Sequence, residues 1–417
     1  MALSDQQIQS LGKDALQRAA AGDFAGAEAL FAQAAEARPN SGQLLHFLGQ
    51  IRLQLGRFAE AREPLERAAS FLPKDPSAQV NLAGCLGRLG LHDDALAALE
   101  RAARLKPNDT AIAHNRGRTL EALGRREEAE RAYDTALAID HRMLPCLSAR
   151  AGLLAARGDW AGALADLDMA LTARPDDARL RLRRGELLLG QGDWWRGLAD
   201  HEARLELADG DRWAAELPLW QGEDPAGPLL VYPEQADIES DAAARDVLML
   251  LRGAEALRAR GIDVAVQCAA RVADWIDLPT TRRGGRTQGF TAAVPLRSLP
   301  HRLDWTLESL PPPGALRLKG QSSSRIGWFA RTAQPPGIVA DGNRDNVARC
   351  GFVVGNDDST TQVAALLGIP TLLLLPNSAD WLWGPRRGPS PWYPSLEVAG
   401  EDDSEKLAAW LGRLSIA

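Results

Sequence analysis

The stretch "GRFAEAREPLERAASFLP", from Gly56 to Pro73, decides the fold of the first half of this 417-residue chain. It opens with a glycine, has alanines five and twelve residues later, and ends in a proline. The same pattern returns every 34 residues, which predicts a stack of similar structural units. The glycines are Gly22, Gly56, Gly90, Gly124, Gly158 and Gly192.

Elementary chain geometry explains this pattern. Glycine suits a turn with φ > 0 because it has no Cβ, so each glycine is predicted to join two helices. The alanines mark places where helices cross closely, and each proline is expected to end the second helix of a pair. The alanines are Ala27, Ala61, Ala95, Ala129 and Ala163, then Ala34, Ala68, Ala102, Ala136 and Ala170; the prolines are Pro39, Pro73, Pro107 and Pro175, with His141 in the one deviant position.

The period and the phased residues resemble the tetratricopeptide repeat, a helix–turn–helix unit. The resemblance implies an α-solenoid of five to six repeats over residues 1–205, with a concave groove for a peptide or a partner helix. Asn81 and Asn115 occupy the same position in adjacent repeats, which such proteins often use to hold a peptide backbone. Ordinary asparagines on a helix surface are the alternative.

Composition limits the kinds of partner and compartment. The net charge of −7 gives no reason to expect nucleic acid, and the apolar runs fall far short of the ~18 residues that span a bilayer. Cys85, Cys146, Cys268 and Cys350 are too scattered for a zinc site or a disulfide framework. With no signal peptide at the N-terminus, we expect a cytoplasmic protein without bound metal.

The repeat pattern breaks in its sixth copy. Gly197 and Arg204 replace the alanines there, and residues 206–228 are predicted to form a turn-rich linker and cap. Tryptophans cluster around this junction, where they could dock a following domain. They are Trp194, Trp195, Trp213 and Trp220.

Strand and helix patterns alternate in the second half. Strands are predicted near 229–232, 263–268, 324–330, 351–356 and 370–376, and helices near 246–260, 270–278, 360–368 and 404–414. This alternation favours an α/β fold with parallel sheets. We expect two lobes, residues 229–320 and 321–417.

The junction and the second half resemble bacterial proteins that join tetratricopeptide repeats to a heptosyltransferase-like glycosyltransferase domain of the GT-B type. The resemblance implies a Rossmann-type α/β domain, a nucleotide-sugar donor and no other cofactor. Such proteins carry G-D-x-x-x-G-x-x-x-x-E-x-R, then P-x-W-x-G-E, and a strand ending in E-Q. The matching residues are Gly192, Asp193, Gly197, Glu202 and Arg204, then Pro218, Trp220, Gly222, Glu223, Glu234 and Gln235.

The acceptor side of this domain departs from the family pattern. In "VYPEQADIESDAAARDVLMLL", Val231 to Leu251, the family's glycine turn is replaced by an acidic, alanine-rich insert at 236–245. The resemblance places Asp246 where the family has its general base, with Glu239 or Asp241 as substitutes. Each could equally be an acid at a helix N-terminus.

The donor side departs as well. In "VVGNDDSTTQVAALLG" the residues Asp357 and Ser359 match the family's phosphate-binding element, while Gln362 replaces a histidine. Thr360 and Gln362 are counted with them as candidate residues for binding the nucleotide sugar. Asp358 adds a negative charge where a diphosphate would approach. Helix N-caps are the alternative interpretation.

The donor lobe also looks shortened. The segment between the strands near 326–330 and 352–354 is too short for a full βαβ unit, although Arg331 could still contact an anion.

Two functions follow from the sequence. The first is an interaction scaffold in bacterial protein or cell-surface glycosylation or assembly, whose repeats bind a protein and whose glycosyltransferase-like domain is degenerate. The second is an active glycosyltransferase that moves a sugar to a protein bound by the repeats. The lost glycines, Gln362 and the short donor segment favour the first.

Overall fold

A computed structural model gives the fold of the chain. It describes residues 3–207, 216–235, 237–281, 287–306, 308–314, 316, 326–330, 340–341, 344–375, 388–390, 392–401 and 403–414. The chain divides into two compact units, Met1–Ala173 and Arg174–Ala417.

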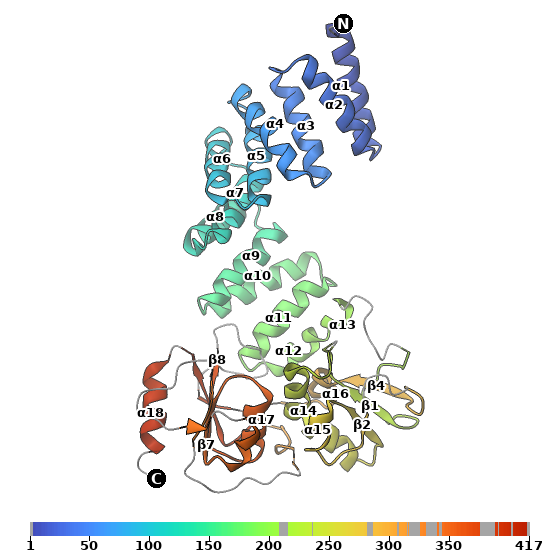
Figure 1. The fold of residues 1–417 in the computed structure, drawn as a ribbon, viewed down its shortest axis with the longest axis vertical. Coiled ribbons are helices and arrows are strands. Elements are labelled where there is room, and N and C mark those ends of the chain that lie inside the picture. Colours follow the sequence, from blue (N-terminus) through green and yellow to red (C-terminus); the bar gives the residue numbers. More distant parts are fainter. Residues whose placement is uncertain are drawn as a thin grey trace. The chain divides into compact units, whose positions relative to one another are not determined.

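The first unit consists of five antiparallel helix pairs (Figure 1). The two helices of each pair pack against each other, and the second helix of each of the first four pairs packs against the first helix of the next pair, as expected for a repeat array. A sixth pair, α11 (Ala178–Gly190) and α12 (Trp194–His201), begins the second unit. The five pairs are α1 (Asp5–Ala20) with α2 (Phe24–Ala37), α3 (Gly42–Gln54) with α4 (Phe58–Phe71), α5 (Pro76–Arg88) with α6 (His92–Leu105), α7 (Thr110–Ala122) with α8 (Arg126–Ile139), and α9 (Leu144–Ala156) with α10 (Trp160–Ala173).

The glycines and alanines do what their spacing predicted. All six phased glycines lie in the turn inside a helix pair, with φ between +73° and +88°. The alanines at both phased positions of the first five pairs are fully buried, because a larger side chain would separate the crossing helices.

The prolines have a smaller role than predicted. Pro39, Pro73, Pro107 and Pro175 each lie two residues beyond the end of a helix, but α8 ends at the equivalent residue, Ile139, with His141 two residues further on. The helix end therefore does not depend on proline.

The second unit contains two mostly parallel sheets. The four-stranded sheet has the order β3-β2-β1-β4 and the six-stranded sheet the order β6-β5-β7-β8-β10-β9, in which only β9 is antiparallel to its neighbour. The strands are β1 (Leu229–Tyr232), β2 (Val264–Gln267), β3 (Thr280–Thr281), β4 (Ala292–Pro295), β5 (Ile326–Phe329), β6 (Ala340–Asp341), β7 (Phe352–Gly355), β8 (Thr371–Leu375), β9 (Gly388–Pro389) and β10 (Leu396–Gly400).

Helices of very different length accompany these strands. The longest is α14 (Asp241–Ala259), which contacts β2 of the first sheet and α17 of the second. The others are α13 (Arg204–Leu207), α15 (Ala270–Ala273), α16 (Leu299–Arg302), α17 (Ser359–Leu366) and α18 (Ser404–Leu414), with the 3-10 helices η1 (Leu296–Ser298) and η2 (Arg344–Arg349).

Several predicted boundaries were wrong. Helix α14 begins at Asp241 rather than near residue 246, because the Ser240 hydroxyl caps it by accepting the Ala243 N–H at 3.2 Å. The helix predicted over 270–278 stops at Ala273, and Ile276 instead forms an antiparallel bridge to Leu316. Strands β4 and β10 were not predicted.

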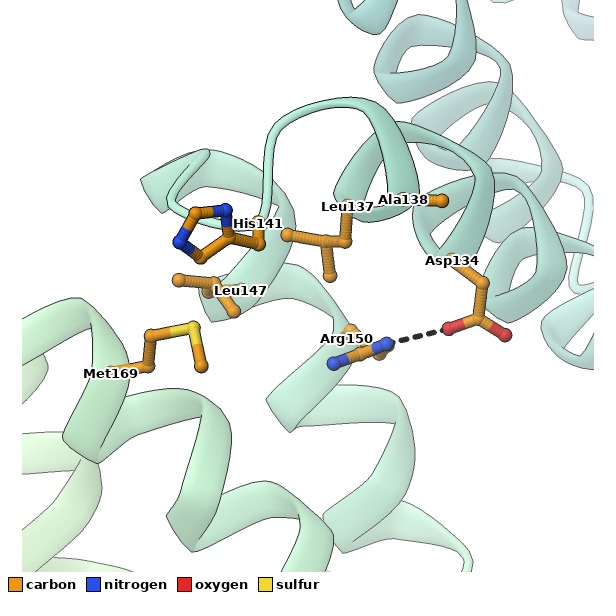
Figure 2. A pocket seen from close by; sticks show the side chains of 7 residues that line it. All are labelled: Asp134, Leu137, Ala138, His141, Leu147, Arg150 and Met169. Atoms are coloured by element: carbon orange, nitrogen blue, oxygen red, sulfur yellow. Dashed lines mark hydrogen bonds and ion pairs between the residues drawn. The ribbon is translucent and has the colours of Figure 1, made fainter.

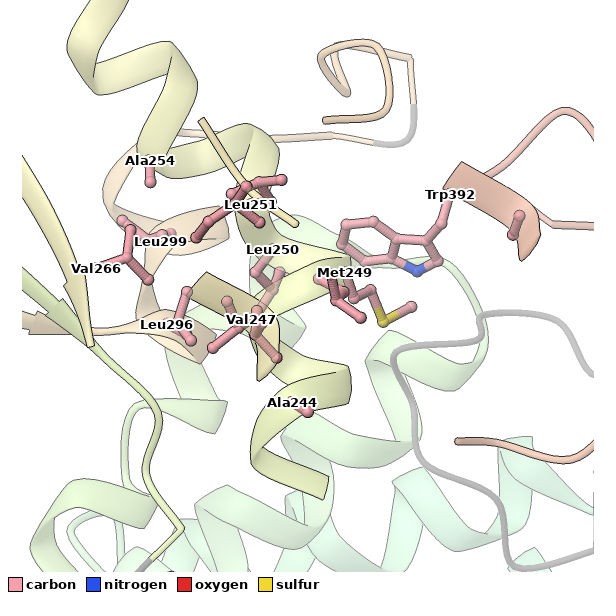
Figure 3. Close-up of a cluster of buried hydrophobic side chains, with 14 of the residues drawn as sticks. Ala244, Val247, Met249, Leu250, Leu251, Ala254, Val266, Leu296, Leu299 and Trp392 are labelled. Atoms are coloured by element: carbon pink, nitrogen blue, oxygen red, sulfur yellow. The ribbon is translucent and has the colours of Figure 1, made fainter. Parts of the chain in front are cut away.

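One hydrophobic core joins the sixth helix pair to both sheets. Trp194 and Trp220 are buried, and the Trp194 ring lies 5.3 Å from that of Trp392. Figure 3 shows Trp392 beside the apolar side chains of α14, including Met249. Two of the four tryptophans at the junction, Trp194 and Trp220, thus pack inside the second unit. Trp195 is 73% exposed, and Trp213 lies outside the described residues.

Candidate functional site

The two asparagines predicted to line the repeat groove lie on α5 and α7, half-buried, at equivalent positions of successive pairs. Their surroundings differ. The Asn81 amide nitrogen lies 2.6 Å from Nε2 of His46 on α3, so it already has a partner. The backbone carbonyl of Asn115 accepts the Thr119 hydroxyl at 2.9 Å, and the side-chain amide of Asn115 takes no part in this bond.

An open pocket of about 310 Å³ lies between α8, α9 and α10 (Figure 2). Leu137, Leu147 and Met169 form its apolar part. On its polar side Arg150 donates to Asp134 at 2.7 Å and also forms two hydrogen bonds to Asp166 on α10. The pocket can accept an apolar side chain beside a polar edge.

The sequence held a signal for this pocket that was not used. His141 lines it and stands where the other repeats have proline. The sequence pattern indicates only a break in the repeat at His141, so it does not predict the pocket.

Three motif residues of the junction, Glu202, Arg204 and Glu234, meet in one buried ion cluster in the second unit. Arg204 donates to both carboxylate oxygens of Glu234, at 2.9 and 2.7 Å, to Glu202 at 2.6 Å and to Ser298 at 2.7 Å. Arg302 also donates to Glu202 at 2.8 Å. Burial lowers the pKa of Arg204, but the charges of Glu234 and Glu202 outweigh it and raise the pKa overall.

The predicted general base, Asp246, is fully buried on α14. It accepts hydrogen bonds from Gln235 at 2.7 Å, from Arg297 at 2.7 Å and from Arg245 at 2.8 Å. Burial raises its pKa, but Arg297 and Arg245 outweigh burial, so the pKa is lowered. A general base works best with a pKa near the working pH, and the burial and lowered pKa of Asp246 do not favour that role in this arrangement.

The predicted phosphate element forms the N-terminus of α17. Asp358 caps the helix by accepting the Thr361 N–H at 2.9 Å, which the sequence allowed as the alternative interpretation. Asp357 is paired with Arg245 at 2.7 Å. The Ser359 N–H donates to Asp241 at 3.0 Å, and the Ser359 hydroxyl donates to the same carboxylate.

The remaining predicted donor-site residues are enclosed or lie outside the description. Thr360 is buried, and the Gln362 side chain, fully buried, accepts the Tyr393 hydroxyl at 2.6 Å. Arg331 lies outside the described residues.

Glu239, the substitute base, is exposed on the insert before α14.

The described residues also bear on metals and membranes. In the part of the chain that the structure describes, no group of three or more histidine, cysteine or acidic side chains is placed to hold a metal ion. Among the helices described, none combines the length and the apolar character that crossing a membrane requires.

Family models described as tetratricopeptide repeat match residues 18–84, 65–110 and 111–141. The N-terminal region carries tetratricopeptide repeats. The three matches together run from the last turn of α1 to just beyond the end of α8, consistent with the 34-residue period. No curated protein matches the sequence.

Solved structures, among them tetratricopeptide-repeat proteins, are similar to part of the chain. A thermophilic repeat protein of Thermus thermophilus is 27% identical, with a TM-score of 0.36, over 44% of this chain and 99% of its own. A repeat protein of Parabacteroides merdae is 23% identical, with a TM-score of 0.43, over 48% and 80%. The pilF protein of Pseudomonas aeruginosa is 17% identical, with a TM-score of 0.44, over 50% and 94%.

Acid is expected to destabilise the fold through one buried histidine, His201, and three half-buried ones. Burial lowers the pKa of His46, His114, His201 and His301, so the folded chain keeps them neutral while the unfolded chain binds protons. Stability present at neutral pH is therefore lost as the pH falls below about 6.5. Thermal unfolding between pH 7.5 and 5.5 measures the loss.

The His201→Gln variant should show a smaller loss on acidification than the wild type, although it is less stable at pH 7.5. His141→Gln is the matched control, because it replaces an exposed histidine with the same side chain. A loss that His201→Gln does not reduce would contradict the assignment to this histidine.

Proposed function

We propose that this chain is a protein-interaction scaffold. Its tetratricopeptide repeats bind a protein or peptide partner, and its second unit is a glycosyltransferase-like domain without turnover. Stacked repeats present a continuous groove lined by the first helix of each pair, which suits an extended peptide. The setting we propose, from the family resemblance, is protein or cell-surface glycosylation or assembly in bacteria.

One observation supports the role without turnover: the side chains that a transferase would use are already paired with other side chains of this chain. Asp246 is buried among Gln235, Arg245 and Arg297, and its pKa is lowered. The N-terminus of α17 is occupied by the carboxylate of Asp241. In this arrangement the base position and the phosphate position are both in contact with the chain's own side chains, which supports a role without turnover.

Partner capture tests the scaffold function. The full chain is used to capture and identify a partner, and affinity is then measured for the double variant Asn81→Ala with Asn115→Ala. We expect the affinity to fall about 5- to 30-fold, because two amide hydrogen bonds to a peptide backbone are lost. Circular dichroism shows whether losing the Asn81–His46 contact has disturbed the helices.

The matched control is Asn40→Ala with Asn108→Ala, which removes two exposed asparagines from the connections between repeats. This control should bind like the wild type. Equal affinity of the Asn81/Asn115 variant and the wild type would remove the groove from the proposal.

The alternative is an active glycosyltransferase, and the pair of parallel sheets supports it. In that case Asp246 or Glu239 would act as base. Asp357, Ser359, Thr360, Gln362 and Arg331 would bind the nucleotide-sugar donor. Calorimetric titration with a panel of nucleotide sugars separates the two functions: saturable binding that Asp357→Ala abolishes would favour the transferase.

A further inference from the structure

Helix α14 carries a polar stripe that faces the six-stranded sheet. Arg245 and Arg252 follow Asp241 by four and eleven residues, which places the three within about 40° of one another around an α-helix. Asp241 contacts Ser359, Arg245 contacts Asp357 and Arg252 contacts Trp392. These partners follow β7 or precede β10 of that sheet. The contacts differ in chemistry and together extend from the first residue of the helix to Arg252.

The first contact places a carboxylate at the N-terminus of α17. Both oxygens of Asp241 accept hydrogen bonds from Ser359, one from its backbone N–H at 3.0 Å and one from its hydroxyl. The first N–H groups of a helix have no partner within it, and the helix dipole favours negative charge there. The chain's own carboxylate therefore fills the position that an anion would take.

The second contact is an arginine bridge. Arg245 donates to Asp246 on its own helix at 2.8 Å and to Asp357 before α17 at 2.7 Å. The side chains of Arg245 and Asp357 are 13% and 16% exposed, so water screens this bridge only partly.

The third contact is the most enclosed. Arg252 is 2% exposed and donates to the backbone carbonyl of Pro311 at 2.7 Å and to that of Trp392. Its guanidinium also lies 5.3 Å from the centre of the Trp392 ring. An arginine placed in this way is held by both hydrogen bonds and cation–π attraction.

The extra turn of α14 makes the first two contacts possible. Because Ser240 caps the helix, residues 241–245 are helical, and these residues carry Asp241 and Arg245. A helix starting near residue 246, as first predicted, would not present them on this face.

We propose that Asp241, Arg245 and Arg252 of α14 form a three-point latch that holds the two sheets of the second unit together. In this latch Asp241 acts as a built-in anion at the N-terminus of α17. The latch concerns the second unit alone, so it goes beyond the scaffold function. It can also be tested without a partner or a substrate.

Hydrogen–deuterium exchange on the full chain tests the latch. In Asp241→Ala we expect the amides of residues 359–366 to exchange about tenfold faster, because a charge-assisted contact to the first turn is lost. Exchange in α5 and α7 should not change. The matched control is Glu239→Ala, which removes the same charge from an exposed position two residues earlier and should behave like the wild type.

Chemical rescue tests the built-in anion. Sodium acetate supplies the carboxylate that Asp241→Ala lacks, so it should restore slow exchange in residues 359–366, whereas sodium chloride at equal ionic strength should not. Failure of acetate to do better than chloride would overturn the anion role. Unchanged exchange in Asp241→Ala, or an equal rise throughout residues 174–417, would overturn the latch.

Discussion

Replacing Arg204 by methionine is expected to destabilise the second unit by about 3–5 kcal/mol, the usual cost of breaking a buried ion pair from one side. The Arg204 side chain is 10% exposed and neutralises Glu234 and Glu202 together. Methionine fills a similar volume without charge, so both carboxylates would lose their shared arginine. Arg302 would still reach Glu202, but Glu234 would keep no arginine of the cluster.

Urea unfolding of the full chain measures this effect. The transition that reports the second unit should move to lower urea, while that of the repeats in the first unit should stay in place. Arg196→Met is the matched control, because that arginine is 54% exposed and pairs with Asp193 on the surface. It should cost less than about 1 kcal/mol. Equal effects of the two variants would contradict the buried-cluster interpretation.

Replacing Gly185 by alanine is expected to destabilise the second unit by about 2 kcal/mol, because a Cβ has no room there. The added Cβ would lie 2.8 Å from the backbone nitrogen of His201 and 2.9 Å from the carbonyl oxygen of Gly197. Backbone atoms cannot move aside as a flexible side chain can, so the close crossing of α11 and α12 would have to open. Overpacking of this kind costs about 1–3 kcal/mol and exceeds the gain of about 1 kcal/mol in helix propensity.

Gly190 on the same helix supplies the control, because a Cβ there meets nothing within 4 Å. Gly190→Ala should therefore stabilise the unit by up to about 1 kcal/mol. Denaturation midpoints of the two variants should move in opposite directions. A stabilising Gly185→Ala would show that the two helices can separate without loss.

The repeats could be predicted in detail because their information is local and repeated. A glycine with φ near +80° and an alanine at a helix crossing impose the same restriction in every copy, so each position was observed several times in one sequence. The helix start at Asp241 was missed because the acidic insert offers several possible caps, and only the contact made by Ser240 selects one.

The candidate site could be predicted only as a set of residues. Asp241, Asp246, Asp357 and Ser359 were recognised as chemically important, and the structure brings them close together around Arg245. The sequence could not show that these groups are paired with one another. Arg297 reaches Asp246 from another segment, and the Arg245–Asp357 and Asp241–Ser359 contacts each span more than a hundred residues. Pairing over such distances leaves no periodic trace in the sequence.

By itself, the sequence determined the solenoid and the alternation of strands and helices after it, and it predicted a set of candidate site residues. Only the tertiary structure decided whether those residues face a ligand or each other, and it placed carboxylate against arginine and helix N-terminus. The physical reason is that helix and turn preferences act over a few residues. The pKa and accessibility of a charged group depend on whatever the fold brings within a few ångströms of it.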